Sequence, residues 1–185
     1  MKAFLRSQNS INLFIGWCLY PLGDLIGQLL LGKFSGGRLL VMTLMGGLVY
    51  RYEIPLWFKW LDSIKFSKSS HLPKILFTES NDSLALSWVG RTLGAMLYFN
   101  PLWIARHVAL IQYASDGFKW KLSFPESLSE LLKVGVHSFL TNLPISLVGN
   151  YIIQKKLPLK YRFAGSATLS CLLSVAYAVE YHFFK

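Results

Sequence analysis

The stretch LLVMTLMGGLVYRYEIPLWF, residues 39–58, has the length and composition of a membrane-spanning helix except for Arg51 and Glu53. Each charge costs about 2.5 to 3.5 kcal/mol at the centre of a spanning helix, whereas each large aliphatic or Phe residue favours insertion by only about 0.3 to 0.6. We therefore expect this helix to need neighbours, with both charges facing protein or water. Because Pro55 cannot donate a hydrogen bond to the carbonyl of Arg51, we also expect the helix to kink there, beside a cavity.

The composition extends this interpretation to the whole chain. Of its 185 residues, 53% are apolar and only 15% are charged, with a mean hydropathy of +0.40, which is not typical of a soluble domain. We predict one all-α membrane domain over 1–185, a bundle of four or five transmembrane helices plus a short interfacial helix before Asn100. The candidate spans are 11–31, 39–59, 92–114, 131–154 and 163–184. The longest connection is the polar segment 60–83, and the four-helix alternative lays the last segment along the membrane surface.

The excess of 19 Lys and Arg over 9 Asp and Glu is explained by the positive-inside rule. With five spans, the basic residues on the side of the N-terminus are Lys2, Arg6, Lys59, Lys65, Lys68, Lys74, Arg91, Lys155, Lys156, Lys160 and Arg162. Those on the opposite side are Lys33, Arg38, Lys119, Lys121, Lys133 and Lys185. Because the basic residues sit in connections without a base-stacking motif, nucleic acid is not an expected partner.

Polar side chains within the candidate spans are the candidates for a functional site, because ionisable groups in a membrane usually face a partner or a wet cavity. The pore-lining or gating candidates are Asp24, Gln28, Arg51, Glu53, Arg106, His107, His137, Asn142 and Asn150. Glycines at helical spacing indicate close helix packing. The packing candidates are Gly16, Gly23, Gly27, Gly46 and Gly47.

No pattern typical of a soluble enzyme, a phosphate-binding loop or a metal site occurs, and the four histidines are dispersed. We expect no cofactor, no metal and no catalytic activity. A membrane enzyme acting on lipid or thiol substrates remains a minor alternative, since it depends only on Cys18, His137 and scattered carboxylates. The retained apolar segment 11–31 is expected to act as an anchor, because no small-residue cleavage site follows it.

Four sets of residues, in this order, resemble the Mpv-seventeen/PMP-twenty-two family of small membrane proteins. The first is LGDLIGQLLL at 22–31, and the second is an ungapped block with Arg38, Met42, Gly46, Trp57, Phe58, Lys59, Leu61 and Asp62. The third is Phe99-Asn100-Pro101. The fourth is Pro144 with Asn150-Tyr151 and PLKYR at 158–162. The chain departs from the family pattern at Arg51, Tyr52 and Pro55, so it resembles a divergent member.

The resemblance implies a helical protein of the mitochondrial inner or peroxisomal membrane that forms a weakly selective pore or metabolite pathway; the residues themselves leave a bacterial membrane open. The basic groups within the spans add an expected preference for small anionic solutes, tested by neutralising Arg51 or Arg106. A homo-oligomer is compatible with this hypothesis. The alternative is a structural or assembly protein whose charges pair internally, for example Asp24 with Arg51.

Overall fold

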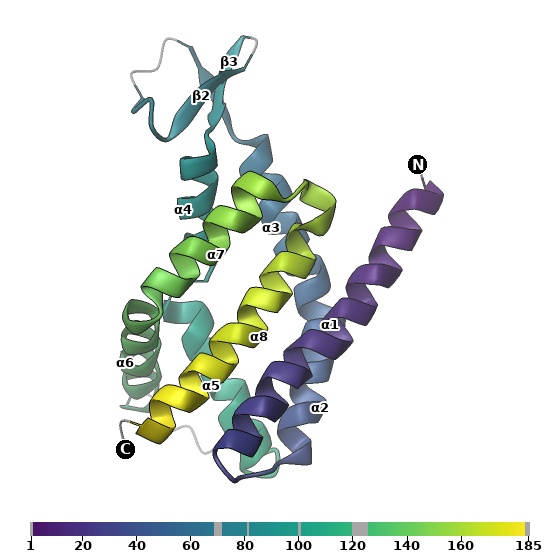
Figure 1. Ribbon diagram of the computed structural model, residues 1–185, viewed down its shortest axis with the longest axis vertical. Helices are drawn as coiled ribbons and strands as arrows, with labels where there is room; N and C mark the ends of the chain where they lie inside the picture. The colour runs from purple at the N-terminus through teal and green to yellow at the C-terminus, as the bar shows by residue number, and fades with distance from the viewer. Residues whose placement is uncertain (1, 69–71, 81, 100, 120–125, 184–185) are drawn as a thin grey trace.

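The computed structural model describes residues 2–68, 72–80, 82–99, 101–119 and 126–183 (Figure 1). It is mostly helical, which confirms the predicted helical class. The helical elements are α1 (Lys2–Leu30), α2 (Gly36–Leu44), the π-helix η1 (Met45–Tyr50), α3 (Arg51–Ser63), α4 (Trp88–Tyr98), α5 (Pro101–Ser115), α6 (Glu126–Thr141), α7 (Leu143–Lys156) and α8 (Leu159–Phe183). The strands are β1 (Lys65–Ser67), β2 (Phe77–Ser80) and β3 (Ser83–Leu86).

Two helical stretches among the described residues are long and apolar enough to cross a membrane. They are Ser10–Leu30 and Gly36–Ser63, and they match the first two predicted spans. A third is obtained if the bent pair Leu128–Thr141 and Leu143–Lys156 is one span. The structure is therefore that of a helical protein with two or three candidate membrane-spanning segments.

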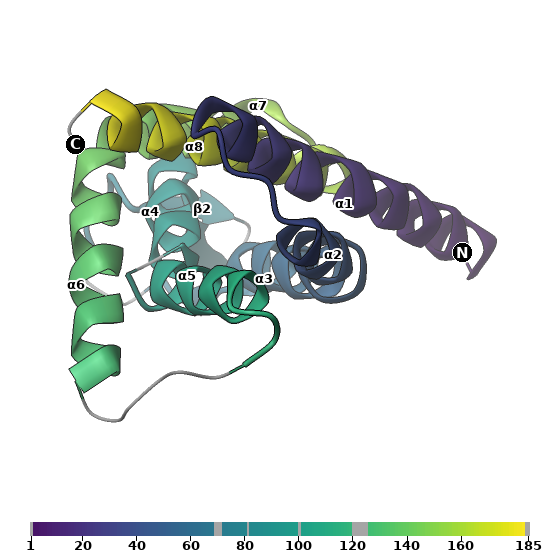
Figure 2. The same cartoon turned by 90° about the horizontal axis from the view of Figure 1, so that it is seen from below.

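The helices form two layers with one helix across their side (Figure 2). In Figure 2, α1, α7 and α8 lie together in one layer, and α2, α3, α4 and α5 lie in the other. Helix α6 stands across both layers and packs against α5. The chain ends of this arrangement point to opposite ends of the molecule (Figure 1).

The turn between α1 and α2 has a glycine after the first helix and a serine cap before the second. Gly32 adopts a positive φ of 63°, a conformation that glycine takes without steric cost, and it lies two residues beyond the end of α1. Ser35 caps α2 by accepting a hydrogen bond from the backbone N–H of Arg38. The start of α1 was not predicted, because this helix begins at Lys2 and runs through the polar residues before position 11.

The expected break at Pro55 is wrong, because Gly36–Ser63 is one continuous helical stretch. Its irregularity lies earlier, in the π-helical turn Met45–Tyr50 that contains Gly46 and Gly47. Pro55 is accommodated inside α3. The second predicted span therefore continues through this proline as one helical stretch.

The breaks occur in the third and fourth predicted spans instead. The segment 92–114 is divided between α4 and α5, with Phe99 closing α4 by a bond from its N–H to the carbonyl of Ala95. The segment 131–154 is divided at Asn142 into α6 and α7, which meet at 68°. Pro144 lies in the first turn of α7, where its missing N–H ends the ladder of α6.

A small antiparallel sheet, which the sequence did not predict, forms from strands in the polar connection 60–83 and the residues that follow it. The strand order is β1-β3-β2, with Lys65 opposite Ala85 and Phe77 opposite Leu86. Strands of three and four residues are too short to show a clear alternation of apolar and polar side chains. Figure 1 shows this sheet beyond the ends of α3 and α4.

Four of the glycines predicted to pack helices lie at close helix crossings. A Cβ at Gly16 would lie 2.2 Å from the carbonyl oxygen of Gly46, so α1 and η1 meet backbone to backbone. A Cβ at Gly47 would overlap the ring of Trp17, and one at Gly23 would lie 2.8 Å from the Cα of Cys171 on α8. Gly27 is buried and lies beside a cavity.

Candidate functional site

A cavity of about 820 Å³ lies between α1, α5, α6, α7 and α8. Its volume falls within the range of small-molecule sites, and most of its lining is apolar with a few convergent polar groups. Apolar and aromatic lining residues include Tyr20, Leu31, Phe99, Trp103, Ile104, Val108, Ile111, Val134, Phe139 and Leu173. The polar lining residues are Asp24, Arg38, His107, His137, Ser138, Thr141, Asn142, Ser146, Ser170 and Ser174.

A hydrogen-bonded ion pair forms the wall of the cavity next to the α1–α2 turn. The carboxylate of Asp24, whose residue is only 5% exposed, pairs with the guanidinium of Arg38. Its second oxygen accepts a hydrogen bond of 2.6 Å from the amide of Gln28. The Gln28 side-chain oxygen in turn accepts the backbone N–H of Ser35. These contacts tie the end of α1 to the start of α2.

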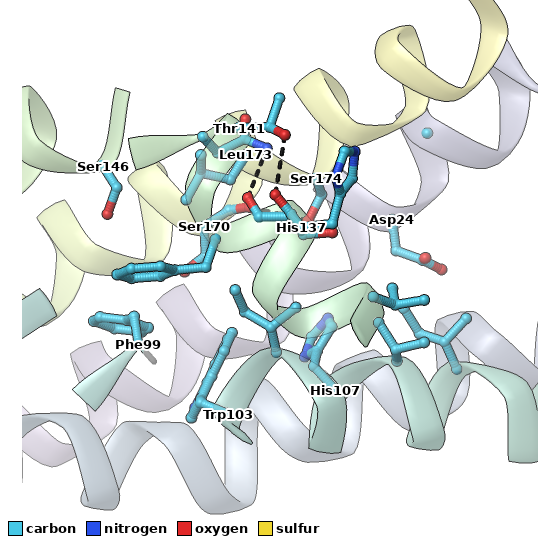
Figure 3. Close-up of a pocket in the computed structure, with 18 of the residues that line it drawn as sticks. Asp24, Phe99, Trp103, His107, His137, Thr141, Ser146, Ser170, Leu173 and Ser174 are labelled. Carbon is cyan, nitrogen blue, oxygen red and sulfur yellow. Dashed lines mark hydrogen bonds between the residues drawn. The ribbon is translucent and has the colours of Figure 1, made fainter. Parts of the chain in front are cut away.

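The wall formed by α5 is aromatic (Figure 3). His107 stacks on Trp103 with ring centroids 5.2 Å apart, and Trp103 contacts Phe99 at 5.1 Å. The Nδ1 atom of His107 lies 3.1 Å from the hydroxyl oxygen of the buried Tyr50. In Figure 3, Trp103 and His107 rise from one side of the space, and Ser170 and Ser174 come from α8 on the other.

Two polar stripes run along α7 and α8. Residues four apart share one face of a helix. On α7 and at its start this face carries Asn142, Ser146, Asn150 and Gln154, all of which are buried. On α8 it carries Arg162, Ser166, Ser170 and Ser174. Asn142, Ser146, Ser170 and Ser174 line the cavity, so both stripes begin there.

The stripes meet along the contact of the two antiparallel helices. A Cβ at Gly149 on α7 would touch Leu169 on α8, and one at Gly165 on α8 would touch Leu157 and Ile153. These two glycines therefore mark the line along which the helices touch. Asn150 and Ser166 each follow one of these glycines in sequence. In two antiparallel helices, the residue that follows a contact residue points to the same side of the contact line on both helices. Asn150 and Ser166 therefore lie on the same side. We call Asn142, Ser146, Asn150, Gln154, Ser166, Ser170 and Ser174 the polar seam.

Several buried atoms of the polar seam lack a hydrogen-bond partner among the described residues. They are the side-chain oxygens of Asn142, Asn150 and Ser166 and both polar side-chain atoms of Gln154. Asn150 uses only its amide N–H, which it donates to the carbonyl of Ser146 at 2.9 Å. Each unpaired buried group costs about 1 to 3 kcal/mol, so the seam favours a polar occupant such as water.

Beyond the seam, an ion-pair cluster lies at the end of the molecule that carries the sheet. The Nη1 atom of Arg162 contacts both oxygens of Asp62, at 2.8 and 2.9 Å. The Nε atom of Arg91 lies 3.5 Å from the same carboxylate. The cavity, the polar seam and this cluster therefore form a succession of polar groups from the α1–α2 turn to the opposite end.

The cavity gathers four of the nine residues predicted to line a pore, Asp24, His107, His137 and Asn142. Gln28 and Asn150 are buried next to it and bind to residues of its wall. The other three, Arg51, Glu53 and Arg106, do not line this cavity. Glu53 pairs with Arg106 at 3.1 Å, and Arg51 packs over the ring of Tyr52.

The proposed partnership of Asp24 with Arg51 is wrong, because Asp24 pairs with Arg38 across the α1–α2 turn. The distance along the chain explains the difference. Arg38 lies in the first turn of α2, next to the end of α1, whereas Arg51 lies beyond the rest of α2 and the whole of η1. The test of anion preference at Arg51 or Arg106 also loses its basis, because neither side chain lines the cavity.

Sequence reasoning missed Arg38, Ser146, Gln154, Ser166, Ser170 and Ser174 as residues of the cavity or the polar seam. The signal was present as a four-residue spacing of polar residues on α7 and α8. It was weak because Ser is common in helices of membrane proteins, where it bonds its own backbone. Ser174, for example, donates to the carbonyl of Ser170 at 3.0 Å.

Comparison with protein-family models, with curated proteins and with solved structures finds no match to this chain.

Proposed function

We propose that this chain is an integral membrane protein that provides a weakly selective pathway for a small polar solute through the cavity and along the polar seam. The observation that carries the proposal is that the polar seam continues directly from the cavity. Buried, unpartnered polar atoms extend from a cavity of about 820 Å³ toward the opposite end of a helical protein. In a hydrocarbon environment such groups are retained where they face water or a ligand.

The proposed topology has four or five spans. It is supported by α8, whose 25 residues extend about 37 Å at 1.5 Å per residue and pack lengthwise against α1. It is also supported by the broken pair α6 and α7, because irregular backbone at membrane depth is tolerated where it borders a cavity. Asn142, at this break, lines the cavity.

We also propose membership of the Mpv-seventeen/PMP-twenty-two family and a place in the mitochondrial inner or peroxisomal membrane. The support is that residues carrying the resemblance bind one another. Asp24, Gln28 and Arg38 form the ion-pair wall of the cavity, and Asp62 pairs with Arg162. The first contacts join the motif at 22–31 to the block from Arg38 to Asp62. The pair of Asp62 with Arg162 joins that block to the motif at 158–162.

The charges of the lining favour weak selectivity. Arg38 and Asp24 neutralise one another, so the Asp and Arg side chains of the described lining add no net charge to the cavity. Such a lining gives a small solute little electrostatic preference for either sign of charge. We propose that small neutral polar solutes pass readily and that any preference for small anions is slight.

Filling the cavity is expected to stop transport. Ser174→Phe places a ring in the lining, whereas Thr168→Phe on the same helix places it on the exposed outer face. The two residues are otherwise matched, because each hydroxyl donates to the carbonyl four residues earlier. We expect proteoliposomes with Ser174→Phe to lose efflux of small neutral polyols, while Thr168→Phe retains it. Equal efflux from both variants would contradict the proposal.

The structural or assembly alternative is favoured by one observation. The buried or half-buried carboxylates Asp24, Glu53 and Asp62 are all ion-paired. Such pairing fixes helices against each other without needing a pathway. Folded wild-type protein that gives no efflux in the same proteoliposomes would decide for this alternative.

A further inference from the structure

The end of the molecule that carries the sheet is strongly basic. It brings together the end of α3, the sheet, the start of α4 and the connection from α7 to α8 (Figure 1). Its basic residues are Lys59, Lys65, Lys68, Lys74, Arg91, Lys155, Lys156, Lys160 and Arg162. Its acidic residues in the described segments are Asp62, Glu79 and Asp82, and Asp62 is already neutralised by two arginines. This end is therefore suited to an anionic partner.

A notch of about 550 Å³ lies within this basic end, between β2, the start of α4 and the end of α7. Its cations are Lys74, Arg91 and Lys155, and Ser87 and Thr78 add hydroxyl groups. The ammonium group of Lys155 is held over two rings, 4.6 Å from the centre of Trp88 and 5.2 Å from that of Tyr151. The charge is thereby fixed at the mouth of the notch.

The wall that carries Lys74 is anchored by backbone contacts. Ser87 donates its N–H to the carbonyl of Leu76 at 2.8 Å and its hydroxyl to the carbonyl of Ile75 at 2.6 Å. A Cβ at Gly90 would lie 2.4 Å from the Leu76 oxygen, so the absence of a side chain lets this segment approach α4. Arg91 is fixed by a bond of 2.9 Å from Nη1 to the carbonyl of Leu86.

The rim of the notch is apolar as well as basic. Ile75 is 67% exposed and Trp88 is 40% exposed, both beside the cations. Trp and Tyr gather at the level of lipid headgroups because their rings are apolar with one polar edge. Exposed apolar groups beside cations suit a ligand that has an acyl chain as well as a phosphate, whereas a free phosphate ion would use only the cations.

We propose that this notch binds the phosphate of an anionic phospholipid, with Lys74 and Lys155 as the cations that contact it. The apolar residues Ile75 and Trp88 then lie against the first carbons of the acyl chains. The notch and the cavity share no lining residue. The lipid proposal therefore does not depend on the proposed transport function.

The test is equilibrium binding of phosphatidylglycerol and phosphatidylcholine to the purified full chain in detergent, followed by native mass spectrometry. We expect a preference for phosphatidylglycerol in the wild type. Lys155→Gln and Lys74→Gln should each weaken phosphatidylglycerol binding about fivefold, since one cation near an anionic surface contributes that much. Lys59→Gln, an exposed lysine at the same end but outside the notch, should change nothing.

Thermal unfolding of each variant shows whether it is folded. All three variants are expected to fold, because Lys59, Lys74 and Lys155 are exposed on the surface. Equal weakening by Lys59→Gln and Lys155→Gln would overturn the site, because a diffuse surface charge explains that result. Absence of any preference in the wild type would also overturn it. Displacement of the lipid by equimolar inorganic phosphate would assign the notch to a free anion and would overturn the lipid proposal.

Discussion

Asp24→Asn is expected to destabilise the protein by about 3 kcal/mol, because it leaves the charge of Arg38 without its partner in a mostly buried site. The value lies at the low end for a broken buried pair, since the Arg38 side chain is 21% exposed and can turn part of its charge outward. The bond from Gln28 to the Asp24 carboxylate weakens at the same time. The measurement is the free energy of unfolding in detergent micelles.

Asp82→Asn is the matched control, because this carboxylate is exposed in the turn before β3. It should leave the free energy of unfolding unchanged. The double variant Asp24→Asn with Arg38→Gln should recover part of the loss, since no uncompensated charge remains. The role of the pair would be contradicted if Asp24→Asn were as stable as Asp82→Asn.

Gly46→Val is expected to separate α1 from η1 and to cost about 3 kcal/mol, at the upper end for overpacking. A Cβ at this position would lie 2.3 Å from the carbonyl oxygen of Gly16 and 2.7 Å from a ring carbon of Tyr20. The nearest atom belongs to backbone, which cannot turn aside as a side chain can. The helices must move apart, and Tyr20 then loses contact with Tyr50, whose ring centre is 4.9 Å away.

Gly36→Val provides the control for this substitution. Gly36 begins α2, has ordinary helical backbone, and nothing lies within 4 Å of an added Cβ. Valine is at least as compatible with a helix as glycine, so the melting temperature should stay the same. If Gly36→Val and Gly46→Val lowered the melting temperature equally, the close crossing of α1 and η1 would not exist in the folded protein.

The first two helical spans could be predicted from the sequence, because they depend on local signals. The apolar runs predicted the spans at 11–31 and 39–59, and Gly32 marks the turn after α1. The position of the kink could not be predicted in the same way. Both Pro55 and Pro144 lie in predicted spans, but only the second stands at the first turn of a new helix. Which proline breaks a helix is decided by the neighbours that pack around it.

Several residues of the candidate site could be predicted from the sequence, but the partners of its charged side chains could not. Asp24, His107, His137 and Asn142 stand out in the sequence as polar groups in apolar runs, and the structure brings them to one cavity. The partner of each charge depends on how the helices cross. Glu53 meets Arg106 because α3 and α5 lie in the same layer, a fact with no signature in the local sequence.

The most direct test of the central claim is the accessibility of the cavity to water in a lipid bilayer. In a Cys171→Ala background, Ser174→Cys introduces a thiol into the cavity, while the native Cys18 lies on the exposed face of a candidate span. Proteoliposomes are treated with a charged, membrane-impermeant thiol reagent. We predict labelling of the introduced thiol and labelling of Cys18 only after denaturation. Equal labelling of both thiols, or protection of the introduced thiol until denaturation, would contradict a water-filled cavity inside a membrane protein.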